Sequence, residues 1–267
     1  MLKININKIK ELRNITGVGI LECKKALVAT KGNINLAINY IRKYSQIESI
    51  KKSNNLTKEG IIISFVKKNI GILLEINCQT DFVAKSIHIT NFAQNIIEYI
   101  FNYKITDIIK IKNVFEEEKI KLIGILKENI SINRFSVIEG KFIGQYIHHS
   151  KRIGVLLQSN LDNQLLMKKI AMHIAMLKPR YIQEKNIPNN VLHEEYQLQK
   201  DIAKNNKKSK IIINKITKGR VQKFINNITL YNQKFLFDNN QTVSHFLKEN
   251  DMEIFQFINF ELGSKYN

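Results

Sequence analysis

The chain has 267 residues, of which 44% are hydrophobic and 24% are charged, a composition typical of a globular protein long enough to bury more than one core. Two Cys residues are too few for a disulfide framework, and no uncharged apolar run reaches the ~18 residues that a membrane-spanning helix needs. The N-terminal stretch MLKININKIKEL lacks the long apolar segment of a signal peptide. We therefore expect a cytoplasmic protein with reduced thiols.

The net charge of +19, from 42 Lys and Arg against 23 Asp and Glu, would ordinarily indicate a nucleic-acid or membrane-surface partner. Only 6 of these basic residues are Arg, which recognises phosphates and base edges best. Lys, Ile and Asn supply 115 of the 267 residues, as A/T-rich bacterial codons would give. We therefore expect solvated lysines, with no membrane partner and no specific nucleic acid. A lysine-rich RNA or ribosome-surface binder is the alternative, which strong salt dependence would identify.

The first 43 residues show the apolar spacing of three short helices. Gly17 and Gly32 follow two of the stretches as C-terminal stops, and Asn33 precedes the third as an N-cap. The apolar positions are Ile6, Ile9 and Leu12, then Ile20, Cys23, Ala26 and Leu27, then Ile34, Ala37, Ile38 and Ile41. Helices this short are marginal alone, so we expect a packed three-helix module over 1–54, with 44–59 as helix tail and linker.

Two apolar, β-branched stretches at 61–67 and 70–78 predict a pair of strands joined by a tight turn at Lys68 and Asn69. The sequence QTDFVAKS that follows predicts a loop. Beyond it, the patterning predicts helices at 90–101 and 114–128 and a strand at 131–138. These elements form the first of two expected core subdomains, residues 55–140.

An internal repeat occupies the middle of the chain: KKNIGILLEIN at 67–77 resembles SKRIGVLLQSN at 150–160, and the helical stretches that follow also align. Such a repeat predicts two related α+β subdomains with antiparallel sheets, the second formed by 141–190 and 227–267. The second copy has no counterpart of TDFVAK. This segment is a candidate for function, because loops on a rigid frame often carry binding residues.

Residues 191–226 are strongly helical and break at 205–209, which predicts an inserted antiparallel helical hairpin. Its apolar positions form a narrow seam, typical of a device for association. Further elements, namely strands at 228–237 and up to Leu262 and a helix at 242–248, are expected to complete the second sheet. The expected fold class is therefore α+β, with a helical N-terminal module, a two-subdomain core and a helical hairpin.

The residue types that commonly perform catalysis do not occur here at the spacings of known active-site motifs. Cys23 and Cys78 lie in a predicted helix and strand, where small buried thiols are the ordinary interpretation. His173 lies in the apolar sequence IAMHIAML and is expected to be a core histidine. No metal-ligand motif, glycine-rich phosphate loop or nucleophile–base pattern is present. We expect no enzyme, no metal and no cofactor; a Cys/His hydrolase is the alternative, and it requires Cys78 beside a histidine.

In isolation, TDFVAK has an ordinary structural interpretation, in which Asp81 caps the next helix and Phe82 enters the core. Six segments, however, resemble the bacterial elongation factor Ts family in the same order along the chain. They are ELRNITGVGILECKKAL (11–27), EINCQTDFVAK (75–85), YIHHSKRIGVLL (146–157), KKIAMHIAMLKP (168–179), EYQLQKDIA (195–203) and FELG (260–263). The similarity covers nearly the whole chain.

This resemblance implies a guanine-nucleotide exchange factor that acts in translation elongation. Such a factor binds the GDP form of elongation factor Tu and promotes GDP release by displacing the magnesium ion, so that GTP rebinds. The resemblance also implies that the N-terminal module is UBA-like and that the hairpin allows a homodimer. No cofactor of the factor's own is implied.

The family motif assigns residues to these roles. The match to TDFV implies that Thr80, Asp81, Phe82 and Val83 reach the magnesium site of the GTPase. Three residues of the N-terminal module, Arg13, Ile20 and Leu21, stand at positions that contact the same partner. His148 occupies the place of a contacting histidine, although its neighbour His149 leaves the choice between the two open. Family members commonly continue past FELG into a C-terminal helical module, and that contact is expected to be missing here.

Overall fold

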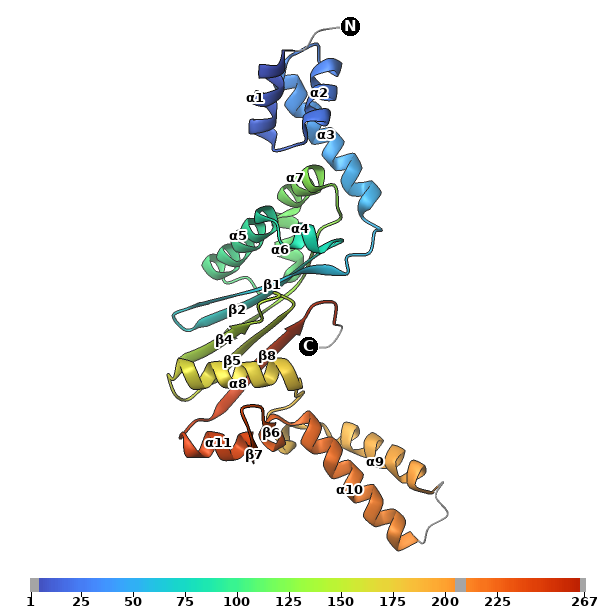
Figure 1. Cartoon of the computed structure of the whole chain (residues 1–267), viewed down its shortest axis with the longest axis vertical. Coiled ribbons are helices and arrows are strands. Elements are labelled where there is room, and N and C mark those ends of the chain that lie inside the picture. Colours follow the sequence, from blue (N-terminus) through green and yellow to red (C-terminus); the bar gives the residue numbers. More distant parts are fainter. Residues whose placement is uncertain (1–4, 205–209, 265–267) are drawn as a thin grey trace.

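Two three-stranded antiparallel sheets stack face to face in the middle of the molecule, and helices cover their outer faces (Figure 1). The computed structural model describes residues 5–204 and 210–264. The first sheet has the order β1 (Glu59–Lys67), β2 (Ile70–Cys78), β3 (Ser131–Glu139), and the second has the order β4 (Phe142–Ile147), β5 (Ile153–Ser159), β8 (Ile254–Glu261). The predicted α+β class with antiparallel sheets is confirmed.

The middle strand of each sheet carries, near its start, a glycine that allows the other sheet to approach. A Cβ atom on Gly71 of β2 would lie 2.9 Å from Ile143 Cγ2, and one on Gly154 of β5 would lie 2.6 Å from Ile62 Cγ2. Both distances are shorter than van der Waals contact, so only glycine fits this stacking. The layer between the sheets consists of Ile62, Leu73, Ile138, Ile143, Leu156, Phe260 and Leu262. The repeated Ile-Gly pair of the sequence thus marks the interface of its two copies.

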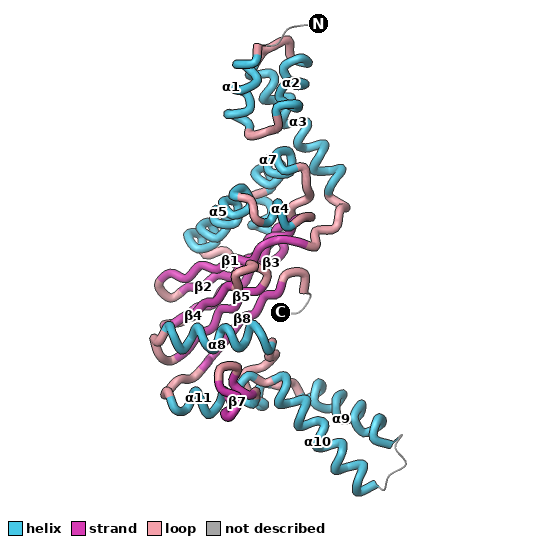
Figure 2. Tube along the Cα trace, in the orientation of Figure 1, coloured by secondary structure: helices cyan, strands magenta, loops and turns pink. Residues whose placement is uncertain are grey.

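Each sheet buries its outer face under its own helices. The first is covered by α5 (Ile87–Tyr103), α6 (Ile108–Val114) and α7 (Glu116–Leu126), and the second by α8 (Gln164–Leu177) and α11 (Val243–Glu249). Along β2, Ile72, Leu74 and Ile76 face the helices while Leu73 faces the other sheet. Burial on both faces explains the continuous apolar run of this strand. The predicted strand–helix repeat is confirmed in β2–α5 and β5–α8 (Figure 2).

The N-terminal helices α1 (Ile6–Thr16), α2 (Ile20–Ala29) and α3 (Ile34–Lys52) pack around a small core of their own. Gly17 ends α1 with a φ of 70°, and the Asn33 side chain caps α3 by accepting the N–H of Leu36, both as predicted. The third helix is longer than its apolar pattern suggests. Its second half packs on α7, where Gly124 leaves room for Ser45. This contact with the core, absent from local patterning, stabilises the additional turns.

The hairpin helices are α9 (Asn189–Lys204) and α10 (Lys210–Ile228), which pack against each other and project from the second subdomain (Figure 1). The predicted break at 205–209 lies outside the described residues. A 3₁₀ turn, η1 (Glu184–Asn186), precedes α9. No helix in the described part of the chain combines the length and apolar character that crossing a bilayer requires.

The predicted strand at 228–237 is wrong. The chain there forms the end of α10, the 3₁₀ turn η2 (Leu230–Asn232) and the two-residue strand β6 (Lys234–Phe235), which pairs with β7 (Asp238–Thr242) in a separate small sheet. The Gln233 side chain donates to the carbonyl of Asn227 at 2.6 Å and folds the backbone into this turn. The N–H groups of Leu230 and Leu236 also donate to the carbonyl of Tyr181 and to His173 Nδ1, so tertiary hydrogen bonds override local β-propensity here. The helix predicted at 114–128 is confirmed as α7, and the separate short helix α6, which ends at Val114, was not predicted.

His173 of α8 is fully buried, as expected of a core histidine. Its Nδ1 accepts the N–H of Leu236 at 3.2 Å, so its Nε2 carries the proton and donates to Gln233 Oε1 at 2.9 Å. Burial lowers the pKa of His173, since the charged ring would lose its hydration. The ring is therefore a neutral structural element that joins α8 to β6.

We predict that Gly154→Ala lowers the free energy of unfolding by about 1–3 kcal/mol, because the methyl group forces the two sheets apart. Gly219→Ala is the matched control: nothing lies within 4 Å of a Cβ atom there, and the residue is inside α10. The control should raise stability by about 0.5–1 kcal/mol through helix propensity. Urea unfolding of both variants measures this, and equal effects would contradict close sheet packing.

His173→Gln should flatten the acid side of the stability profile. The unfolded chain protonates this histidine near its ordinary pKa of about 6.5, whereas the folded protein resists protonation. The contribution of neutral His173 is thus full above that pH and is lost as the pH falls towards the lower folded-state pKa. Melting temperatures between about pH 7.5 and pH 5 should fall less steeply in His173→Gln than in wild type. Parallel profiles would show that the ring is not held neutral.

Candidate functional site

The segment 80–83, named here the TDFV segment, leaves the end of β2 and forms most of the one-turn helix α4 (Asp81–Ala84). Thr80 Oγ1 caps this helix by accepting the N–H of Val83 at 3.4 Å. Val83 is buried in the core of the first subdomain, whereas the side chain of Phe82 is 82% exposed. The helical turn thus fixes one apolar residue inside and turns the adjacent aromatic ring outward.

One expectation for this segment is wrong, and the ordinary interpretation that was weighed against the family resemblance does not hold. The predicted loop contains a helical turn, because the Thr80 hydroxyl accepts the free N–H of Val83 in its first turn. The ordinary interpretation of Asp81 and Phe82 also fails, since Thr80 caps α4, Ser86 caps α5 and Phe82 stays outside the core. An isolated aromatic ring with this exposure leaves apolar area in contact with water, worth about 25 cal/mol per Å² on burial. Its burial by a partner would be favourable.

Asp81, the other outward residue of the TDFV segment, forms an ion pair with Lys85 at 2.7 Å on the same face of the turn. The hydrogen bond from Lys85 lowers the pKa of the Asp81 carboxyl, which is therefore ionised at neutral pH. Because both side chains are solvated, the pair contributes little to stability. The site thus presents an exposed ion pair beside an exposed ring.

The turn between β4 and β5 lies across a groove from α4. This groove has a volume of about 420 Å³, and its lining includes Glu59, Asp81, Lys85, His149 and Arg152. Arg152 pairs with Glu59 of β1, and the N–H of Ile62 donates to the carbonyl of Lys151 at 2.7 Å. These contacts hold the turn of the second subdomain against the first.

The two adjacent histidines of this turn have different environments. His148 is half-buried, and its Nδ1 lies 2.8 Å from Ser150 Oγ. His149 is exposed and lines the groove with Asp81. Their rings are 4.1 Å apart. The structure therefore brings His149 to the groove beside the TDFV segment, with His148 packed behind it.

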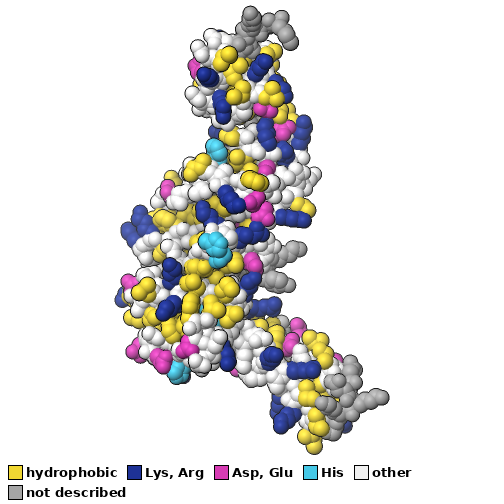
Figure 3. All heavy atoms as spheres, viewed as in Figure 1, with side chains coloured by type: hydrophobic (Ala, Val, Ile, Leu, Met, Phe, Trp, Pro, Cys, Tyr) yellow, Lys and Arg dark blue, Asp and Glu magenta, His cyan; other side chains and the backbone are white. Residues whose placement is uncertain are grey.

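The candidate contact residues of the N-terminal module form a separate surface. Arg13 is exposed at the end of α1, and Ile20 and Leu21 are 56% and 60% exposed at the start of α2. Figure 1 places this module at one end of the molecule, whereas α4 lies beside β1. Figure 3 shows hydrophobic side chains on the surface of this module, with Lys and Arg side chains scattered along the length of the visible face.

The buried thiols argue against a cysteine nucleophile. The Cys78 Sγ donates to the carbonyl of Thr80 at 3.1 Å, and burial raises the pKa of Cys78 to about 12. Burial also raises the pKa of Cys23. Reactive cysteines have lowered pKa values and partial exposure, so both residues are structural.

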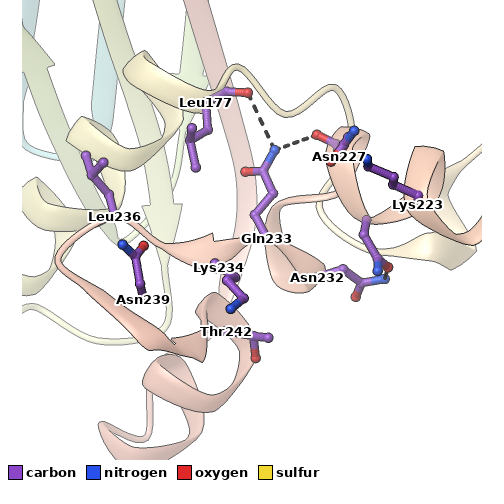
Figure 4. Close-up of a pocket in the computed structure, with 10 residues that line it drawn as sticks. Leu177, Lys223, Asn227, Asn232, Gln233, Lys234, Leu236, Asn239 and Thr242 are labelled. Carbon is purple, nitrogen blue, oxygen red and sulfur yellow. Dashed lines mark hydrogen bonds between the residues drawn. The ribbon is translucent and has the colours of Figure 1, made fainter.

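A hollow of about 770 Å³ lies away from the TDFV segment, between α8, α10 and the β6–β7 pair (Figure 4). Lys223, Lys234 and several amide side chains line it. The Gln233 side chain forms part of the wall of this hollow, and its amide group donates to the carbonyls of Leu177 and Asn227. Its amide is therefore part of the fold rather than a free recognition group.

One residue near the TDFV segment was not predicted from the sequence. The Glu128 carboxylate, after α7, accepts hydrogen bonds from the backbone N–H groups of Gln79 and Thr80 and from the Thr80 hydroxyl. Its partners lie 48 and 49 residues earlier in the chain. Local spacing contains no signal for such a contact, and a single Glu residue outside any motif does not indicate a functional role.

Comparison with known proteins gives consistent matches. A family model described as Elongation factor TS matches residues 79–264, which include the TDFV segment. The chain is 43% identical over 264 residues to the Elongation factor Ts of Buchnera aphidicola subsp. Acyrthosiphon pisum (strain 5A), covering 98% of both chains. It is 41% identical over 263 residues to those of Cronobacter sakazakii and Escherichia coli O139:H28, covering 98% of this chain and 93% of theirs.

We predict that Phe82→Ala changes the free energy of unfolding by less than about 0.5 kcal/mol, as for an exposed side chain. Phe92→Ala makes the same truncation in the core, where Phe92 is 1% exposed, and should cost about 3–5 kcal/mol. Denaturant unfolding of the pair measures both effects. A loss of several kcal/mol in Phe82→Ala would mean that the ring packs inside the protein in solution.

Proposed function

Because this chain belongs to the elongation factor Ts family, we propose that it acts as a guanine-nucleotide exchange factor in translation elongation. Its partner in this proposal is the GDP form of elongation factor Tu. The exposure of Phe82 on a braced helical turn is the observation that supports this role most directly, because the core does not use the ring. The protein acts by binding and forms no covalent intermediate.

In the proposed mechanism, Phe82 enters a pocket of the GTP-binding domain while Asp81 reaches the surroundings of the bound magnesium ion. Mg²⁺ requires near-ideal octahedral coordination, so small displacements of its ligands weaken its binding. A rigid aromatic side chain can impose such displacements without chemistry. Thr80 and Val83 support this insertion from behind, since their side chains are directed into the fold.

Nucleotide and exchange factor are coupled through the same partner. If binding of the factor weakens the affinity for GDP by some ratio, GDP weakens the affinity for the factor by the same ratio. A nucleotide that rebinds therefore expels the factor. This reciprocity allows one molecule of the factor to serve many molecules of elongation factor Tu.

Other parts of the chain take supporting roles in the proposal. The UBA-like module, residues 1–54, adds a second contact through Arg13, Ile20 and Leu21, and His148 or His149 adds a third from the second subdomain (141–190 and 227–267). The hairpin, 191–226, mediates self-association. Exposed apolar side chains support that role, namely Leu198, Ile202, Ile211 and Ile212, with exposures of 54%, 42%, 83% and 47%.

The decisive experiment is release of a fluorescent GDP analogue from purified elongation factor Tu. Phe82→Ala should slow the stimulated release about tenfold, which corresponds to about 1.4 kcal/mol of lost barrier reduction. Tyr103→Ala is the matched control, because Tyr103 is an aromatic residue with 65% exposure at the end of α5. This variant should stimulate GDP release from elongation factor Tu as wild type does. Wild-type rates in Phe82→Ala would refute insertion of the ring.

A further inference from the structure

The TDFV segment is held at its base by a carboxylate from another part of the first subdomain. Glu128 Oε2 accepts the N–H groups of Gln79 and Thr80 at 3.2 and 3.0 Å. Glu128 Oε1 accepts the Thr80 hydroxyl at 2.6 Å. Both oxygens of one side chain are thus bonded to two successive residues, immediately before the turn that presents Phe82.

The segment requires such support for a physical reason. Strand β2 ends at Cys78, so the N–H groups of Gln79 and Thr80 lie beyond the sheet ladder. The following helix α4 has four residues, and a single helical turn is not stable alone. Hydrogen bonds to an ionised acceptor are about twice as strong as neutral ones. Glu128 therefore supplies the fixed end from which α4 starts.

The opposite side of the turn provides no comparable restraint. The Asp81–Lys85 ion pair has side chains that are 51% and 77% exposed, and exposed pairs contribute little to stability. By contrast, Thr80 is half-buried and donates two of the three hydrogen bonds that Glu128 accepts. The direction in which Phe82 projects thus depends on the buried Val83 and on the Glu128 side, and not on the exposed ion pair.

The residue after Glu128 extends the same attachment to the linker below the N-terminal module. The N–H of Asn129 donates to Gln79 Oε1 at 2.9 Å, and its side-chain amide donates to the carbonyls of Ser53 and Asn55 at 3.2 and 2.9 Å. One short turn therefore fixes both the base of the TDFV segment and the linker that follows α3. The two candidate contact surfaces share this support.

We infer that Glu128 is a positioning residue for exchange, which holds Gln79 and Thr80 so that Phe82 is presented in the orientation that inserts into the GTPase. This inference rests on the proposed function. Without the carboxylate, the turn still carries Phe82 but samples more orientations. The turn must then be ordered when the ring inserts, and the free-energy cost of that ordering slows exchange. Glu128 itself makes no contact with the nucleotide or the magnesium ion in this account.

The test uses Glu128→Gln in the full chain, which keeps the size of the side chain but removes one acceptor oxygen and the charge. GDP release from elongation factor Tu is measured against factor concentration, with Glu98→Gln as control because Glu98 is an exposed carboxylate on α5. We expect the maximal release rate to fall about fivefold, with less than about a twofold change in the half-saturating concentration. The control should match wild type.

The double variant Phe82→Ala/Glu128→Gln distinguishes a role of Glu128 in positioning Phe82 from an unrelated loss of activity. If Glu128 acts through the ring, the second substitution adds less than about twofold to the effect of Phe82→Ala, because the two residues are coupled. Hydrogen exchange of the Gln79 and Thr80 amides in the isolated protein should accelerate in Glu128→Gln. Melting curves establish that the compared variants are folded, and Glu128→Asp replaces Glu128→Gln if the latter is not.

Distinct outcomes overturn distinct statements. Wild-type release rates in folded Glu128→Gln, or effects that multiply fully in the double variant, would overturn the positioning role and leave the exchange function standing. Unchanged amide exchange at Gln79 and Thr80 would overturn the role of the carboxylate as their anchor. A wild-type protein that does not accelerate GDP release would overturn the proposed function and, with it, this inference.

Discussion

The arrangement of the candidate site depends on how closely the two sheets stack. Gly71 and Gly154 remove the side chains that would separate the sheets, and each lies against apolar residues of the other sheet. At this spacing the edge of β1 reaches the β4–β5 turn, where the N–H of Ile62 donates to the carbonyl of Lys151. Lys151 also lines the groove between α4 and His149. Residues from separate halves of the repeat thereby form one surface.

A buried ion pair fixes the relative position of the same two sheets. Glu75 of β2 is fully buried and bonds to Arg134 of β3 at 2.8 Å, and Arg134 also donates to the carbonyl of Glu261 and stacks on Phe260 of β8. Burying two charges costs hydration, so such a pair adds little net stability. Other registers of the stack would leave the carboxylate without its partners, at a cost of several kcal/mol. We therefore infer that this pair selects the register rather than strengthening the fold.

The sequence predicted those features that depend on neighbouring residues. The strands β1 and β2, the stops at Gly17 and Gly32 and the Asn33 cap follow from local spacing and backbone chemistry, and the structure confirms them. The prediction for 228–237 failed because distant partners shape that segment: the carbonyl of Tyr181 accepts the N–H of Leu230, and His173 Nδ1 accepts the N–H of Leu236. Family resemblance predicted the family and a role for the TDFV segment, but it gave no geometry for the groove.

The difference between the two copies of the repeat separates scaffold from function. In the second copy, the loop from β5 to α8 turns inward: Asn160 accepts the N–H of Glu253 at 2.7 Å and donates to the carbonyl of Asp251. The loop thus completes its own subdomain and leaves no aromatic ring outside. In the first copy, the corresponding loop is longer, is held by Glu128, and exposes Phe82. Since the same scaffold closes without such a residue, packing does not explain the exposed ring. Its position beside the groove between the subdomains is instead consistent with selection for contact with a partner.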